Sequence, residues 1–230
     1  RWGAGFLTNV LPWVQKSAKV RARMEALAKS EMPVIREQAM FALLIADNKS
    51  PAVTKNPSFE EGSLVAGAAT SGTVPEKVAG DAAFGWNLWK IKDEKGTFAL
   101  SETQAHSGKR SLLVDKMGNG APTQHINFEP GRYYAVAHVF APAAGPATGT
   151  VTVAIQAIGH DGKWVSRAQN GRFEARLSPA GGSWQSVVVP FELQEEQRAS
   201  IKTLQLIVGF SGFAPNSHIF LDDAGIYKLS

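Results

Sequence analysis

The stretch GTVTVAIQAIGHDGKWVSRAQNGRFEARL, residues 149–177, decides the fold class. Apolar and polar residues alternate along much of it, and Val, Ile, Thr and Phe are frequent, as in half-buried β-strands. Asp161-Gly162 and Asn170-Gly171 interrupt this pattern, and an Asp-Gly pair between two such runs is typical of a tight hairpin turn. The stretch therefore predicts three strands. They are expected at 149–158, 163–167 and 172–177.

The same texture extends over the chain from about residue 56 onward. Turn residues such as Gly118-Asn119-Gly120 and Pro130-Gly131 separate the runs. Segment 62–83 is rich in Gly, Ala, Ser and Thr and is expected to be a long surface loop. About ten strands are expected, and no amphipathic helix of useful length is expected after residue 52. This pattern predicts a mainly β fold, a two-sheet antiparallel β-sandwich of jelly-roll type. The further strands are expected at 84–91, 97–102, 110–115, 123–128, 132–140, 184–192, 203–210 and 217–228.

Residues 1–50 have a helical pattern. Asn9 is a candidate N-cap for a first helix, and Ser30, followed by Pro33, is a candidate N-cap for a second. A hairpin of two helices cannot bury its own apolar face, so it must dock either on the following domain or on a preceding one. The expected organisation is a helical hairpin over 1–50, the tail of a preceding domain, and a sandwich over 51–230. A first residue that is Arg rather than Met favours a piece of a longer protein.

The charge excess lies in this helical segment. The chain has a formal net charge of +4, and eight Lys or Arg against four acids in residues 1–50 account for all of it. The remaining 180 residues are neutral, which argues against a nucleic-acid partner and suits a neutral ligand better than a polyanion. The chain has no Cys, so it has neither a disulfide framework nor a thiolate metal site. The sequence contains no run of eighteen apolar residues, so no membrane-spanning helix is predicted.

An ordered set of short motifs carries a resemblance to a known family. The set runs from Asn56-Pro57-Ser58-Phe59-Glu60 through Gly85-Trp86, His106-Ser107-Gly108-Lys109-Arg110-Ser111-Leu112, Gln124, Pro130-Gly131-Arg132-Tyr133-Tyr134 and Trp184 to Leu221-Asp222-Asp223-Ala224. In order and spacing it resembles the carbohydrate-binding modules of galactose-binding-like jelly-roll fold that accompany xylanases, cellulases and other glycoside hydrolases. The resemblance covers about residues 54–229.

The resemblance implies a structural calcium ion. Members of the family commonly hold calcium where the first and last strands meet. Carried over to this sequence, Glu60 and Asp222 would supply side-chain oxygens, and backbone carbonyls near Lys109 would complete the shell. Calcium takes six to eight oxygen ligands, which a fold can collect from distant parts of the chain.

The resemblance also implies a polysaccharide or oligosaccharide ligand. Such a ligand needs flat aromatic faces and planar polar groups. The candidates are Trp164, Trp89, Trp86 and Tyr133, with Tyr134 as a further ring and His138, Gln124 and Gln156 as polar partners. Trp86 and Trp184 lie inside apolar alternation, which also fits core packing. Trp164 directly follows the Asp161-Gly162 turn and is expected to be exposed.

Three functional hypotheses remain open. The first is a non-catalytic binding or bracing module of an extracellular or periplasmic polysaccharide-degrading protein, with the preceding catalytic domain as its partner. The second is a sandwich that only mediates protein contacts. The third is a jelly-roll lyase or hydrolase built around Arg132, Tyr134 and His138, which share one face of a predicted strand.

Overall fold

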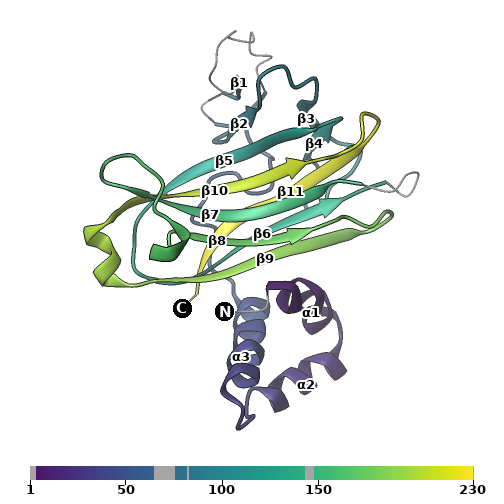
Figure 1. Cartoon of the computed structure of the whole chain (residues 1–230). Coiled ribbons are helices and arrows are strands. Elements are labelled where there is room, and N and C mark those ends of the chain that lie inside the picture. Colours follow the sequence, from purple (N-terminus) through teal and green to yellow (C-terminus); the bar gives the residue numbers. More distant parts are fainter. Residues whose placement is uncertain (1–3, 65–75, 82, 143–147, 230) are drawn as a thin grey trace.

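The computed structural model describes residues 4–64, 76–81, 83–142 and 148–229. Its β part consists of two antiparallel sheets that face each other (Figure 1). In order across the sheet, the six-stranded one contains β1 (Glu76–Ala79), β2 (Asn87–Lys90), β5 (Asn119–Asn127), β10 (Ile201–Ser211), β7 (Thr150–Gly159) and β8 (Arg172–Leu177). The five-stranded one contains β3 (Thr97–Ser101), β4 (Ser111–Asp115), β11 (His218–Leu229), β6 (Gly131–Phe140) and β9 (Trp184–Leu193).

The main core lies between the two sheets, because successive side chains of a strand point to opposite faces. On β6, Tyr133, Ala135, Ala137 and Val139 are buried in this core. From the other sheet, β10 contributes its own alternate residues, Leu204, Leu206, Val208 and Phe210. The predicted two-sheet antiparallel sandwich is confirmed.

Some strand limits differ from the sequence prediction. The Gly118-Asn119-Gly120 run was expected to be a turn, yet β5 begins at Asn119 and Gly120 pairs with Phe210 of β10. The expected strand at 163–167 is reduced to one bridge between Trp164 and Ile158. Part of the expected loop 62–83 is strand β1, which pairs with β2. Residues 65–75 of that loop, and residue 82, lie outside the described residues.

The N-terminal segment has three described helices rather than the two predicted. They are α1 (Ala4–Lys16), α2 (Ala18–Leu27) and α3 (Pro33–Asp47). Ser17 separates α1 from α2, since its backbone is extended and its side chain accepts a hydrogen bond from the Val20 amide. This is the geometry of an N-cap. Two short 3₁₀ helices follow later, over Arg167–Gln169 and Glu195–Ala199.

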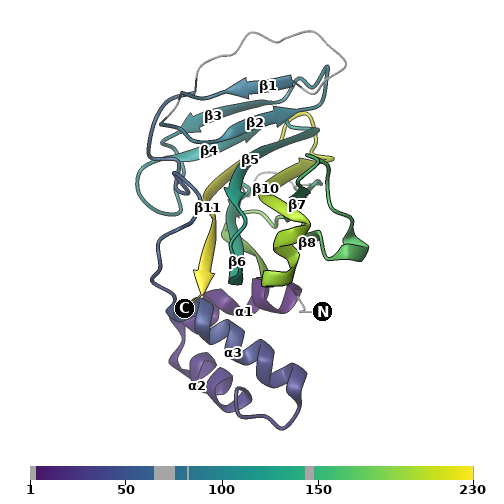
Figure 2. The same cartoon turned by 90° about the vertical axis from the view of Figure 1, so that its left-hand side faces the viewer.

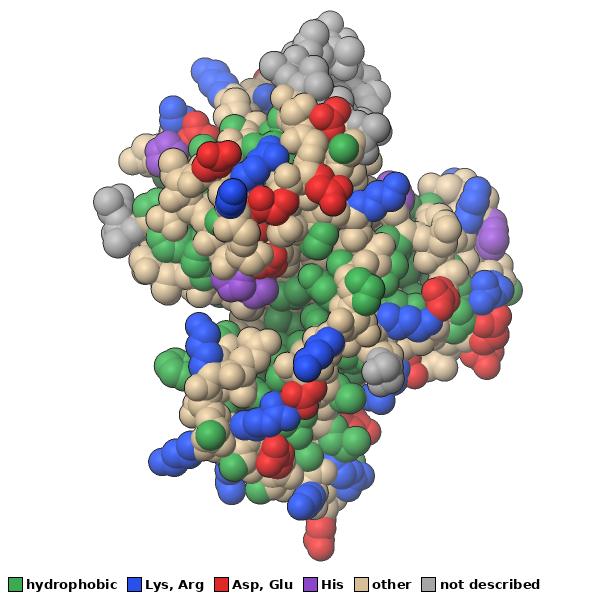
Figure 3. Space-filling model, turned by 180° about the vertical axis from the view of Figure 1, so that it is seen from behind, with side chains coloured by type: hydrophobic (Ala, Val, Ile, Leu, Met, Phe, Trp, Pro, Cys, Tyr) green, Lys and Arg blue, Asp and Glu red, His purple; other side chains and the backbone are tan. Residues whose placement is uncertain are grey.

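The helices pack on the outer face of the five-stranded sheet, at the β9 side (Figures 1 and 2). Leu7, Leu11, Met24, Phe41 and Ile45 form a second core with outward-facing residues of β6, β9 and β11. Seen from behind, hydrophobic side chains fill the junction between the helical part and the sandwich (Figure 3). Of the two docking surfaces left open by the sequence, the following domain is the one occupied.

Helix α1 also covers the edge of this sheet. Strand β9 is the last strand of the five-stranded sheet, and the backbone N–H of Val188 donates a hydrogen bond of 3.2 Å to the side-chain oxygen of Thr8. An uncovered edge strand is a template for unwanted strand pairing. None of the described helices is long and apolar enough to span a membrane.

Candidate functional site

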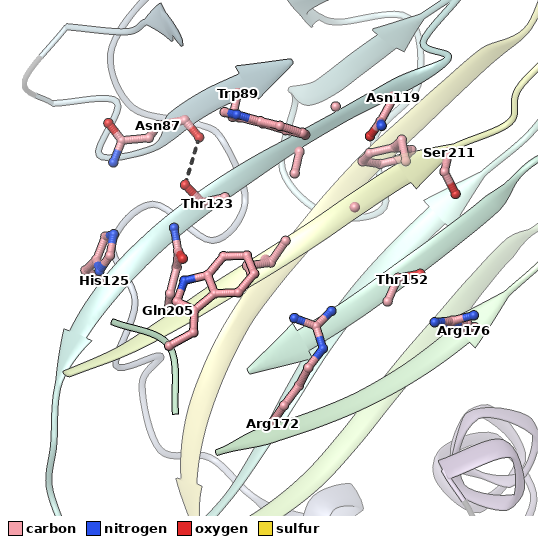
Figure 4. A pocket seen from close by; sticks show the side chains of 16 residues that line it. Asn87, Trp89, Asn119, Thr123, His125, Thr152, Arg172, Arg176, Gln205 and Ser211 are labelled. Atoms are coloured by element: carbon pink, nitrogen blue, oxygen red, sulfur yellow. Dashed lines mark hydrogen bonds between the residues drawn. The ribbon is translucent and has the colours of Figure 1, made fainter. Parts of the chain in front are cut away.

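The outer face of the six-stranded sheet is hollowed into a cleft of about 390 Å³ (Figure 4). Strands β2, β5, β10, β7 and β8 and the segment after β7 all contribute side chains to it. We call this hollow the cleft. Its lining residues are Asn87, Trp89, Asn119, Gly120, Ala121, Thr123, His125, Thr152, Trp164, Arg172, Arg176, Gln205, Ile207, Gly209, Phe210 and Ser211.

The period of two explains which residues reach the cleft. On β5, Ala121, Thr123 and His125 point outward while their neighbours point toward the core. On β10, Gln205 pairs with His125 of β5. Gly209 also lines the cleft, and it has no side chain that would fill it. A Cβ added at Gly209 would meet nothing closer than 3.8 Å, so the cleft has open space above this residue.

Two tryptophans from different parts of the chain line the cleft. Trp89 lies on β2 and is half-buried. Trp164 follows β7 and has 64% of its surface exposed. The tight turn before Trp164 has Gly162 in the left-handed region at φ 77°, and the Gly159 amide donates to the Lys163 carbonyl at 2.8 Å. The turn and the bridge to Ile158 fix where the exposed indole stands.

Polar side chains also line the cleft, and hydrogen bonds hold one of them, Arg172, in place. Arg172 donates to Glu174 at 2.8 Å and to the side-chain oxygen of Gln156 at 3.2 Å. Gln156 is buried and its amide nitrogen donates to three carbonyls, including those of Val165 and Gly171. The network therefore holds Arg172 in place beside the Trp164 segment. Among the predicted polar partners, Gln156 supports the cleft from below rather than lining it.

The structure separates the six predicted ligand-binding residues. Trp164 and Trp89 line the cleft. Trp86 is only 4% exposed, lies in the core and donates through Nε1 to the Asn56 carbonyl at 2.9 Å. Tyr133 is 2% exposed and stacks on Phe191 inside the same core. A buried ring offers no face to a sugar, so neither belongs to the candidate site.

Gln124 has a structural role instead of a place in the cleft. Its side chain is buried and bonds both backbone groups of Lys55, accepting from the amide at 2.9 Å and donating to the carbonyl at 2.6 Å. This pairing fastens the segment that leads into the sandwich to strand β5. Because both the oxygen and the nitrogen of its side-chain amide are already hydrogen-bonded to Lys55, Gln124 is not part of the candidate ligand site.

His138 lies on the other sheet, in a cluster of titratable groups. Its ring stacks on that of His106 with centroids 3.9 Å apart, and His106 Nδ1 lies 2.6 Å from a carboxylate oxygen of Asp223. Burial lowers the pKa of His138 from 6.5 to about 4, and His106 adds to the effect. Among the described residues, His106, His138 and Asp223 are the set whose ligand atoms, within 4.8 Å of one another, could hold a metal.

The lyase candidates do not share a cleft. Tyr134 is buried under the helices, where its ring stacks on Tyr227 and its hydroxyl accepts from Asn48. Arg132 is exposed, and its guanidinium lies over the Phe41 ring at 5.5 Å. His138 is covered by His106. The three residues share a strand face, as predicted, but that face is packed against other parts of the chain.

Glu60, one of the predicted calcium ligands, makes other interactions in the structure. One oxygen of Glu60 accepts the backbone N–H groups of Lys109 and Arg110, each at 2.7 Å. The Arg110 guanidinium donates to the carbonyls of Glu60 and Gly62, at 3.0 and 3.1 Å. The carbonyls here already face a cation, and the carboxylate faces amide donors. A calcium shell would instead need these oxygens turned toward one centre.

Asp222, the other predicted ligand, is in a similar position. It is fully buried and its carboxylate accepts the backbone N–H groups of His106, Ser107 and Asp223 at 2.7 to 3.1 Å. Burial raises the pKa of Asp222 from 3.8 to about 6, the charge of Asp223 raises it further, and the three hydrogen bonds oppose this. Asp222 and Glu60 both fasten the 106–110 loop. The calcium ion stays a prediction that the structure does not test.

Several cleft residues were not singled out from the sequence. His125, Gln205, Asn87, Arg172 and Arg176 carry the polar chemistry of the cleft. The one available signal was the alternation of Arg172, Glu174 and Arg176, which places three charged side chains on one face of a strand. That this face looks onto a cleft depends on the pairing of β8 with β7.

Comparisons with known proteins address the fold. No family model matches the sequence, and no curated protein matches it. A solved family 61 carbohydrate-binding module in complex with β-1,4-galactotriose is 14% identical at a TM-score of 0.50, with 78% of this chain and 99% of that chain covered. The CBM22-1 xylan-binding domain of Paenibacillus barcinonensis Xyn10C is 13% identical at a TM-score of 0.52, with 79% and 96% covered. The chain thus has the β-sandwich fold found in carbohydrate-binding modules.

Proposed function

We propose that this chain is an oligosaccharide-binding module whose ligand lies in the cleft. The observation that carries the proposal is the pair Trp89 and Trp164, which come from different parts of the chain and line the same cleft. An indole ring provides a large apolar face with little conformational freedom to lose, and such a face suits the apolar side of a pyranose. Trp164 has 64% of its surface exposed where it lines the cleft, so its ring is accessible to a ligand.

The polar residues of the cleft support the same function. Asn87 and Gln205 can both donate and accept hydrogen bonds, as a row of sugar hydroxyls requires. Ligand sites generally combine apolar walls with a small number of polar groups that fix orientation. Both solved structures compared above are carbohydrate-binding modules of the same fold, and one of them holds a trisaccharide.

The wider setting is part of the proposal. A module of this kind would serve an extracellular or periplasmic polysaccharide-degrading protein by keeping a preceding catalytic domain near its polymer. The helices would then connect the cleft-bearing sandwich to that domain.

Affinity electrophoresis against a panel of plant and microbial polysaccharides tests the binding function. Trp164→Ala should weaken retardation at least tenfold, since truncating an aromatic anchor costs about 2 kcal/mol or more. Trp13→Ala is a matched control, because Trp13 lies on α1 outside the cleft and is 62% exposed. Equal losses in the two variants, or no retardation of the unaltered chain by any polymer, would refute the proposal.

A second variant tests the cleft without removing a tryptophan. Gly209→Leu would place a side chain in the open space above the cleft floor, where the backbone is an ordinary strand. We expect the chain to keep its melting temperature within a few degrees and to lose binding. Binding that persists in Gly209→Leu would place the ligand elsewhere.

A further inference from the structure

The cleft carries an unbalanced positive charge. Arg172 and Arg176 line it, and none of its lining residues is acidic. The nearest carboxylate on this strand is Glu174, which is paired with Arg172, with Arg176 and with Arg167 from the preceding 3₁₀ helix. Three guanidinium groups therefore surround one carboxylate, and this group of four residues has a net charge of +2.

The neutrality of residues 51–230 hides this local excess. The sequence argument for a neutral ligand used a sum over 180 residues, which gives no information about where the charges lie. Charges more than about 10 Å apart are largely screened at physiological salt, so the field at a ligand comes from its nearest neighbours. Beside the cleft those neighbours are three arginines and the single carboxylate of Glu174, which leaves a local excess of positive charge.

We propose that the glycan bound in the cleft carries anionic groups, either uronate carboxylates or sulfate esters. The inference rests on the proposed function and specifies its ligand class. Arg176 is the principal contact. Its side chain is 65% exposed, and among the described residues its hydrogen bond to Glu174 at 3.2 Å uses only one of its donors. A guanidinium has five donors in a planar fork that matches a carboxylate or sulfate.

Arg172 has a different part in the same interaction. It is held by Glu174 and Gln156 and is 21% exposed on its side chain, so it contributes a fixed charge at the cleft wall. Because Arg172 is already held in place, its side chain loses little conformational entropy when a ligand binds. Trp164 lines the same cleft as both arginines, so a bound oligosaccharide can stack one unit on the indole while an acidic group meets Arg176. Figure 4 shows Arg172 and Arg176 on strand β8, at one side of the cleft.

Matched polymer pairs test the ligand class. The full chain is run in affinity electrophoresis against polygalacturonate and its fully methyl-esterified form, and against a sulfated galactan and its desulfated form. We expect retardation by at least one acidic polymer to exceed that by its neutral partner about tenfold or more, as charge-assisted hydrogen bonds allow. The pair that responds distinguishes carboxylate from sulfate.

Variants then assign the effect to the cleft. Arg176→Gln should weaken binding to the acidic polymer about fivefold to tenfold and leave binding to its neutral partner within twofold. Arg198→Gln is the matched control, because Arg198 is also exposed and ion-paired to one Glu but lies outside the cleft. Raising salt from 50 to 300 mM should reduce the preference for the acidic polymer.

The possible failures are distinguishable. Equal or stronger binding of the neutral polymers overturns the anionic ligand and leaves the sugar-binding function standing. Acidic binding that survives both Trp164→Ala and Arg176→Gln overturns the inference in favour of attraction to the basic helices. Equal affinity for single-stranded poly(U) would show a general polyanion site and overturn it too. If no polymer of either kind binds, the proposed function itself fails.

Discussion

Arg110 joins two parts of the chain that are about fifty residues apart in sequence. Its guanidinium satisfies the carbonyls of Glu60 and Gly62. We expect Arg110→Gln to lower the free energy of unfolding by about 1–3 kcal/mol, since two carbonyl acceptors lose charged donors. Lys109→Gln is the control, because Lys109 contacts Glu60 through its backbone N–H only. Chemical denaturation compares the two variants.

The same variant addresses calcium. If Arg110 acts as the cation at this junction, millimolar calcium should neither raise the melting temperature of the unaltered chain nor restore that of Arg110→Gln, and EDTA should change neither by more than about 1 °C. A calcium-dependent rise of several degrees in the unaltered chain would support the calcium prediction instead.

His138 and Asp222 should make opposite contributions to the pH dependence of stability. The pKa of His138 is lowered to about 4, so the unfolded chain binds its proton more readily and stability falls as the pH drops from about 6.5 to 4. The pKa of Asp222 is raised to about 6, so the folded chain binds its proton more readily and stability falls as the pH rises from about 4 to 6. In the wild type the two effects partly offset.

Removing either group should reveal the other. The change in melting temperature between pH 4.5 and 6.5 is measured by circular dichroism. Compared with the wild type, His138→Asn should have a higher melting temperature at pH 4.5 relative to its melting temperature at pH 6.5. Asp222→Asn should have a lower melting temperature at pH 4.5 relative to that at pH 6.5. Shifts of the same sign in both variants would contradict the pKa values of the pair.

At the scale of elements, the contact between α1 and β9 should be measurable. Thr8→Val keeps the side-chain shape but leaves the Val188 N–H without its acceptor. We expect a loss of about 1 kcal/mol, up to about 3 if water cannot reach the amide. Thr8→Ser, which keeps the oxygen, should retain most of the stability. A loss in Thr8→Ser as large as in Thr8→Val would show that the methyl group matters and the hydrogen bond does not.

Strands could be predicted from the sequence because their alternation is a local property. The failures have physical reasons. Gly120 was assigned to a turn, but a Cβ there would meet the Met117 sulfur at 2.6 Å and the Trp89 carbonyl at 3.0 Å, so close packing inside a sheet demands glycine. The break at Ser17 was missed because α1 ends at Lys16 and α2 begins at Ala18, so a single residue without Gly or Pro separates the two helices.

The candidate site was predictable only in part for the same reason. Trp164 could be found because the Asp161-Gly162 turn that exposes it is local. Arg172 and Arg176 could be placed on one face of a strand, but which face borders a cleft is decided by tertiary pairing. Trp86 and Tyr133 belong to residue types that serve both as sugar contacts and as core, and their alternation within strands already allowed the second role.

At the scale of the whole molecule, ligand binding and stability are linked. A glycan that binds only the folded chain adds about 2.7 kcal/mol at a concentration of one hundred times its dissociation constant. For a chain of this size that corresponds to a rise in melting temperature of about 5–10 °C. Thermal melts of the unaltered chain and of Trp164→Ala with the same acidic oligosaccharide should show the rise in the first and not in the second.

Strand β8 is the outermost strand of its sheet, and this affects how the cleft can be redesigned. The charged residues of this strand, Arg172, Glu174 and Arg176, also keep this edge from pairing with another molecule. Replacing these charged residues with apolar ones, to suit a neutral sugar, would also leave an apolar edge strand that is prone to aggregation. Glutamine at these positions would change ligand choice while keeping the protein dispersed, so specificity and colloidal behaviour have to be engineered together.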